Sequence, residues 1–223
     1  MQPHAPELEE AVIGACLIEQ EALPLIADKL RPEMFYDDHH QLIFAALMAI
    51  CSFITIPLGF TPVPINLATL GVFLTGGILG KKYGSISLIV YILLGAVGVP
   101  VFAGFKGGLG VLAGPTGGYI IGYLAAAFLT GLLVELVFTK TGTDSGQRSA
   151  KSSTSRFIGI ILAMIAGLAA CYALGTAWFM ISTGTGLGAA LISCVIPFLP
   201  GDAAKIIVGA LLVQKLRPAI PIR

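Results

Sequence analysis

The stretch FIGIILAMIAGLAACYALGTAWFMI, residues 157–181, contains no charged side chain. A run of about 20 apolar residues is long enough to cross the hydrocarbon core of a bilayer as an α-helix. The stretch therefore predicts a membrane-spanning helix.

Five further apolar stretches meet or approach this length. They are residues 41–58, 65–80, 84–104, 118–139 and 186–216. The stretch 65–80 is short, and prolines at 197 and 200 with a glycine at 201 interrupt the last one. The sequence predicts an all-α, polytopic integral membrane protein with six transmembrane helices. The sixth is expected to be a short helix followed by a full one from about residue 202.

The distribution of charge divides the chain. Only 11% of its 223 residues are charged, whereas a soluble domain carries about 25%. Nine of the 12 acidic residues lie before position 40, and only Glu135, Asp144 and Asp202 follow. This division predicts a soluble, acidic, helical appendage over residues 1–40, a membrane domain over residues 41–217 and a C-terminal tail over residues 218–223.

Basic residues indicate the orientation of the predicted spans. Alternate loops and the C-terminal tail carry Lys81, Lys82, Lys140, Arg148, Lys151, Arg156, Lys215, Arg217 and Arg223. The loops on the opposite side carry only Lys106. Cytoplasmic loops of membrane proteins are enriched in Lys and Arg. Both termini are therefore predicted to be cytoplasmic.

Two charges lie inside the last apolar stretch, PFLPGDAAKIIVGALLV, residues 197–213. Ionisable residues within membrane spans are costly and usually functional. Asp202 and Lys205 are three positions apart and share one helix face, with Asp202 expected at the helix N-cap after Pro200 and Gly201. The alternative is that Asp202 only caps the helix while Lys205 extends to the interface.

The residue types argue against catalysis. All three histidines precede residue 41, and the four cysteines show no paired or metal-binding spacing. The sequence predicts no enzyme activity, no catalytic residues, no metal and no cofactor. A proton-coupled secondary transporter of a small carboxylic acid or vitamin, in which Asp202 titrates, remains the alternative to a binding protein. A membrane enzyme and a helicase-loading adaptor rank lower.

Three motifs resemble the BioY family, the biotin-specific substrate-capture (S) components of energy-coupling factor transporters. They are TPVPINLATLGVFLTGGILG, LGAVGVPVFAGFKGGLGVLAGPTGGY and PFLPGDAAK, and the resemblance covers residues 42–217. It implies six helices in a bacterial cytoplasmic membrane, a biotin site that opens outward and no nucleic-acid partner. It also implies ATPase subunits and a transmembrane coupling subunit as partners. A solitary mode, in which the protein works without dedicated ATPases, remains an alternative.

The same resemblance implies the site residues. Asp202 and Lys205 carry over from the PGDAAK motif, with Lys205 and the helix start suited to the biotin carboxylate. From the GPTGGY motif come Thr116, Gly117, Gly118 and Tyr119, and Lys106 and Asn66 are further candidates. Ala45 and Ala49, four apart in the first span, imply a small-residue face that docks the coupling subunit. Packing within the chain is the alternative for these two alanines.

The first 45 residues resemble a different family. LEEAV near the start, followed by PEMFYDDHHQLIF, is similar to the N-terminus of DnaB-type replicative helicases. No Walker motif accompanies it, so the resemblance implies no helicase chemistry. It suggests a fusion of this segment to the membrane domain.

Overall fold

The computed structural model describes residues 38–142 and 150–219. The described residues from Gln41 onward belong to one compact unit. The predicted helical appendage therefore lies almost wholly outside the described residues, as do the linker at 143–149 and the last four residues.

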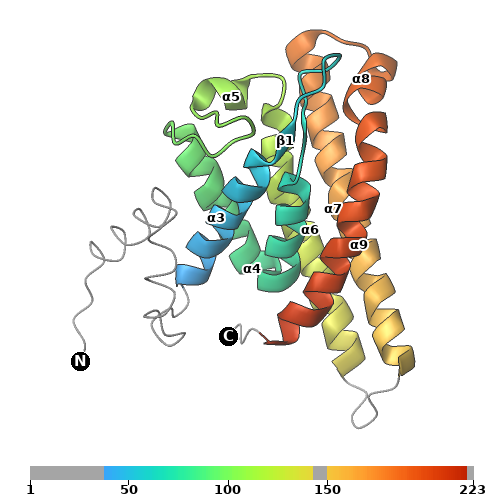
Figure 1. Cartoon of the computed structure of the whole chain (residues 1–223). Helices are drawn as coiled ribbons and strands as arrows, with labels where there is room; N and C mark the ends of the chain where they lie inside the picture. Colours follow the sequence, from blue (N-terminus) through green and yellow to red (C-terminus); the bar gives the residue numbers. More distant parts are fainter. Residues whose placement is uncertain (1–37, 143–149, 220–223) are drawn as a thin grey trace, which may run out of the picture. The chain divides into compact units, whose positions relative to one another are not determined.

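The described chain is mostly helical, as predicted (Figure 1). Its helices are α3 (Asp38–Phe53), α4 (Ala68–Ala96), α5 (Leu109–Ala113), α6 (Gly117–Gly142), α7 (Ala150–Thr183), α8 (Leu187–Cys194) and α9 (Leu199–Leu216), with 3-10 turns at Ile196–Phe198 and Arg217–Ala219. Two short strands, β1 (Thr55–Ile56) and β2 (Ile65–Asn66), were not predicted; they pair antiparallel, with Thr55 opposite Asn66.

Four helical segments of the described chain are long and apolar enough to cross a membrane. They are Ala68–Ala96, Gly117–Thr139, Ser153–Thr183 and Leu187–Leu216, and Leu42–Phe53 is a shorter apolar helix. The segment Leu187–Leu216 joins α8 and α9 through the 3-10 turn, which agrees with the predicted break near the prolines. However, α9 begins at Leu199 and not near residue 202, because Pro200 fits the first turn of a helix.

Helix α4 consists of two helices joined at Gly80, where the chain folds back on itself. Gly80 has φ +80° and ψ −176°, a conformation that is not helical. The amide of Leu67 donates to the carbonyl of Cys51 at 3.1 Å, and the Tyr91 hydroxyl hydrogen-bonds the neighbouring Ser52 at 2.8 Å. Residues 67 and 91 of a straight helix would be roughly 36 Å apart. The halves of α4 on either side of Gly80 are therefore antiparallel neighbours.

Long-range contacts stabilise this break. The amide of Lys81 donates to Oε1 of Glu135 on α6 at 2.9 Å, and Arg217 donates to the carbonyl of Gly77 at 2.6 Å. Helix ends leave backbone groups without intrahelical partners. Glu135 and Arg217 thus supply partners to the two helix ends that meet at Gly80.

The second half of α4 ends earlier than predicted. The apolar stretch 84–104 was expected to be one span, but α4 ends at Ala96. Gly98 has φ +108° and Pro100 follows, so the helix cannot continue through this segment. Residues 97–108 instead form a turn-rich loop that leads into α5.

The opposite ends of the bundle differ (Figure 1). The β1–β2 pair, α5 and α8 lie at one end, and the break in α4 and the ends of α6 and α7 next to the linker lie at the other. Lys81, Lys82, Arg156, Lys215 and Arg217 belong to the end with the break, whereas Lys106 belongs to the end with α5.

The inner face of α3 carries small residues. Ala45 and Ala49 are 3% and 8% exposed and belong to an apolar cluster that includes Ala68 and Val72 of α4. These alanines share this cluster with the α4 residues. Ala45 and Ala49 are thus buried within the chain, and docking of a coupling subunit at this face stays a prediction.

Candidate ligand-binding site

A cavity of about 240 Å³ lies at the end of the bundle that carries the β1–β2 pair. Its walls come from the connection between β1 and β2, the loop before α5, and helices α4, α6, α7 and α9. This volume approaches the lower end of the roughly 300–1,000 Å³ typical of ligand pockets. Of the predicted site residues, Asn66, Lys106, Thr116, Tyr119, Asp202 and Lys205 line it.

Asp202 and Lys205 form a buried ion pair on α9. Asp202 is 2% exposed and Lys205 is 9% exposed. The Lys205 ammonium lies 2.7 Å from Oδ1 of Asp202, as the spacing of three residues on one helix face allows. Lys205 does not extend to the interface. Asp202 is not the N-cap either, because α9 begins three residues earlier and Phe198 occupies that position.

Two residues that the sequence did not single out complete the polar cluster. The Thr69 hydroxyl donates to Oδ1 of Asp202 at 2.9 Å and accepts from Lys205 at 3.1 Å. The Tyr172 hydroxyl donates to Oδ2 of Asp202. Both residues lie in apolar runs, and only the fold brings α4 and α7 to α9, so no sequence signal marks them.

The hydrogen bonds within the polar cluster leave some acceptor and donor sites unused, and these can bind a ligand. A carboxylate oxygen has two acceptor sites, and an ammonium group has three N–H donors. Among the described residues, Oδ1 of Asp202 accepts from Thr69 and Lys205, whereas Oδ2 accepts only from Tyr172. Lys205 donates twice within this cluster. One acceptor at Asp202 and one donor at Lys205 therefore remain, on two groups whose Oδ1 and Nζ atoms lie 2.7 Å apart.

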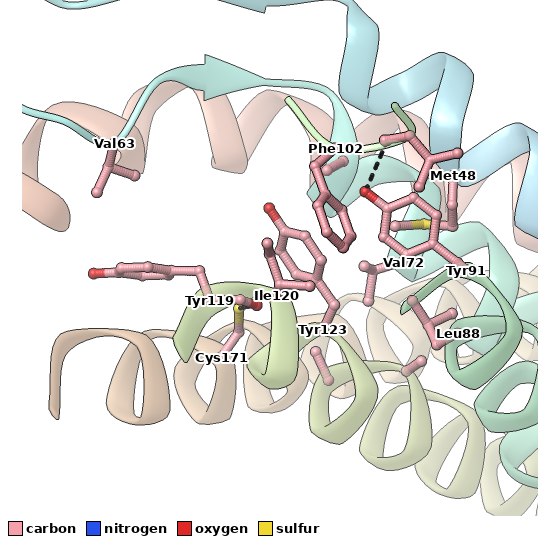
Figure 2. Close-up of a cluster of buried hydrophobic side chains, with 14 of the residues drawn as sticks. Met48, Val63, Val72, Leu88, Tyr91, Phe102, Tyr119, Ile120, Tyr123 and Cys171 are labelled. Carbon is pink, nitrogen blue, oxygen red and sulfur yellow. Dashed lines mark hydrogen bonds between the residues drawn. The ribbon is translucent and has the colours of Figure 1, made fainter. Parts of the chain in front are cut away.

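Aromatic side chains form much of the remaining wall. They are Tyr91, Phe102, Tyr119, Tyr123, Tyr172 and Phe198. Tyr119 and Tyr123 project from the same helix, α6, and Phe102 faces Tyr91 (Figure 2). The rings of Tyr91 and Phe102 are 5.6 Å apart and meet edge to face at 78°. Such surfaces suit an apolar ring or chain.

Lys106 lies in a tight turn at the cavity. Phe102 and Lys106 form an isolated antiparallel bridge, and Phe105 between them has a φ of +56°. The ring of Phe105 stacks on Phe53 at the end of α3, with centroids 4.4 Å apart. This contact ties the turn to α3 and keeps the exposed Lys106 beside the cavity. With Asp202, Lys205 and Lys106 together, the charged side chains of the lining sum to +1.

Gly117 and Gly118 do not line the cavity, contrary to the expectation from the motif. A Cβ on Gly117 would overlap the carbonyl of Leu112 in α5, and one on Gly118 would overlap Trp178 of α7. The Trp178 indole donates to the carbonyl of Gly114 at 2.9 Å. The two glycines therefore allow α5 and α7 to pack closely against the start of α6, which places Thr116 and Tyr119 in the wall.

Asn66 has a structural task at the cavity. Its Oδ1 accepts from the amide of Ala68 at 3.0 Å, at the start of α4. The Tyr119 hydroxyl also has a partner in the chain, since it hydrogen-bonds the hydroxyl of Thr176 at 3.2 Å.

Within residues 38–142 and 150–219, no group of three His, Cys, Asp or Glu side chains is placed to hold a metal ion.

Comparisons with known proteins agree on one family. The family model described as "BioY family" matches residues 38–222. The "Biotin transporter BioY" of Thermotoga maritima is 39% identical over 78% of this chain and 92% of its own length. The protein of the same name from Rhizobium etli is 35% identical over 81% of this chain and 92% of its own length.

Two further matches concern the fold and the N-terminus. A crystal structure of the S-component for biotin from an ECF-type ABC transporter matches with a TM-score of 0.67 and 33% identity, covering 80% of this chain and 89% of that one. The model of the DnaB-like helicase N-terminal domain matches residues 1–53. Because the first of the two family models spans most of the sequence and the relatives align over nearly their whole length, the chain belongs to the BioY family.

Proposed function

We propose that this protein captures biotin and takes it up across the cytoplasmic membrane as the substrate-binding subunit of an energy-coupling factor transporter. The observation that carries the proposal is the Asp202–Lys205 pair, which presents one acceptor beside one donor at an aromatic-walled cavity. The ureido ring of biotin has an N–H beside a C=O on one edge. That edge complements the pair.

This geometry revises the expected orientation of the ligand. Lys205 was the residue expected to meet the carboxylate of biotin, but its charge is already neutralised by Asp202. Lys106 is exposed beside the cavity and has no ion-pair partner within 4 Å among the described residues. We therefore assign the ureido ring to the buried pair, the valeryl chain to the aromatic wall and the carboxylate to Lys106. The net lining charge of +1 supports a monoanionic ligand.

The proposal extends to the membrane topology. Helix α3, the two halves of α4, α6, α7 and the α8–α9 unit are assigned to six crossings, the shorter ones relying on the bilayer's tolerance of mismatch. The end with most basic side chains is assigned to the cytoplasm, together with both termini. The cavity lies at the other end and opens outward.

The partners belong to the same proposal. In the described residues no catalytic constellation accompanies the cavity, and uptake requires energy. ATPase subunits and a membrane coupling subunit are assigned that role, in line with the ECF-type S-component that the fold matches. Residues 1–40 are assigned to an appendage of helicase N-terminal type fused to this unit, since the two family matches overlap only at residues 38–53.

Equilibrium binding to purified protein in detergent tests the function. Radiolabelled biotin should bind saturably, with one molecule per chain, and unlabelled biotin should displace it. A straight-chain carboxylic acid of similar length serves as the competitor without a ureido ring and should not displace it. Absence of saturable binding, or equal displacement by the simple acid, would reject biotin capture and favour the transporter of small carboxylic acids.

A further inference from the structure

Tyr172 occupies an unusual place in the cavity wall. It lines the ligand cavity and also a second, apolar cavity of about 250 Å³ between α7 and α8. The second cavity is lined by Ala173, Thr176, Ala177, Met180, Leu187, Leu191 and Val195. The half-buried Tyr172 side chain therefore separates the polar cluster from an apolar space while its hydroxyl points to Asp202.

The hydroxyl of Tyr172 determines how many hydrogen-bond acceptor sites of Asp202 are available to a ligand. Thr69 and Lys205 both donate to Oδ1, so that oxygen is fully used. Tyr172 is the sole donor to Oδ2 among the described residues. Without this hydroxyl, Oδ2 would offer two acceptor sites in place of one, and the carboxylate would be held through Oδ1 alone.

We infer that Tyr172 is a positioning and specificity residue: by donating to Oδ2 of Asp202 it leaves a single acceptor beside the single Lys205 donor, so that the site selects a urea over a group with donors only. The inference rests on the proposed function, because it needs biotin as the ligand. Tyr172 acts through Asp202, and its side chain lines both cavities.

The test uses a ligand pair that differs only at the ureido oxygen. In 2-iminobiotin this oxygen is replaced by nitrogen, and the resulting guanidinium is a cation that only donates near neutral pH. Against the Lys205 donor it is mismatched, so the parent protein should bind biotin more tightly. The Tyr172→Phe variant keeps the aromatic ring and removes only the hydroxyl.

Dissociation constants for both ligands should be measured on the full chain in detergent, together with the Tm. Tyr172→Phe should weaken biotin by about tenfold, the magnitude expected when a hydrogen bond to a charged group is lost. Its affinity for 2-iminobiotin should be unchanged or greater, because Oδ2 gains an acceptor site. The preference for biotin over 2-iminobiotin should therefore fall by about tenfold or more.

A second tyrosine, Tyr83, provides the control for the Tyr172→Phe variant. Tyr83→Phe makes the same chemical change on α4 outside the cavity and should leave both affinities unchanged. If Tyr172→Phe weakens both ligands equally, its role is packing and the inference is wrong. It is equally wrong if neither affinity changes. Failure of the parent protein to bind biotin would instead reject the proposed function.

Discussion

At the scale of single residues, the charges at the cavity have separate tasks. Asp202 and Lys205 neutralise each other where a lone buried charge would be very costly. Thr69 and Tyr172 satisfy most of the remaining hydrogen-bonding capacity. Lys106 lies in a turn with exposed neighbours and carries the surplus positive charge of the lining. In the proposed binding mode, recognition of the polar ring is thus separate from attraction of the anion.

Replacing Lys106 by Met tests this separation. We expect the affinity for biotin to fall by roughly two- to fivefold, the range for a solvent-exposed ion pair. The affinity for biotin amide, which lacks the carboxylate charge, should stay the same. Lys82→Met, at the opposite end of the bundle, is the matched control and should change neither value. An equal loss for biotin and its amide would show that Lys106 does not meet the carboxylate.

At the scale of elements, small residues lie on the face of α3 that is buried in one apolar cluster with α4. Ala45, Met48 and Ala49 face inward with Val72, while Ile43 and Ile50 on the same helix are about half exposed. Two alanines four residues apart give a helix a narrow face, whether that face packs within the chain or against another protein. Whether that face meets another protein or the same chain depends on which helix covers it.

Changing both Ala45 and Ala49 to Leu should lower the Tm and, with it, the fraction of protein that binds biotin. Extra methylene groups in a filled core cost about 1–3 kcal/mol per site. Ala46→Leu, which adds the same atoms at a partly exposed position, should be tolerated. Unchanged Tm and biotin binding in the double variant, with loss of co-purification with a coupling subunit, would instead support the docking role.

At the scale of the whole molecule, the two ends of the bundle carry different chemistry. One end joins helix termini through Lys81–Glu135, Arg217–Gly77 and Gln214–Ser153 contacts. The other end holds the cavity beneath loops rich in proline, glycine and aromatic residues. This polarity is what a bundle needs if it accepts a ligand on one side of a membrane and works with partners on the other.

Cysteine labelling in intact cells tests the orientation. Gly59→Cys lies in the exposed connection between β1 and β2, with open space around its Cβ. A membrane-impermeant maleimide should label it from outside, while Arg148→Cys in the linker should react only after lysis. The parent chain, which contains Cys16, Cys51, Cys171 and Cys194, provides the background, and the last three are buried. Labelling of the linker in intact cells would reverse the topology and the direction of the cavity.

Much of the architecture was predictable because membrane insertion depends on local sequence properties. Length and hydropathy are read along the chain, so the runs that became α6, α7 and the α8–α9 unit were located to within a few residues, apart from the polar N-terminal part of α7. The early end of α4 was missed because apolar residues continue past Ala96, and hydropathy does not register the backbone conformation of Gly98.

The sequence by itself determined the apolar helices, the asymmetry of basic residues and the Asp202–Lys205 pair, because each depends on composition or on spacing along one helix. Only the tertiary structure decided that Thr69 and Tyr172 bind Asp202, that Gly117 and Gly118 serve packing, and that Ala45 and Ala49 face the core. These outcomes depend on which helices meet across the bundle. Residues 69 and 172 are far apart along the chain, so no local pattern specifies their meeting at one carboxylate.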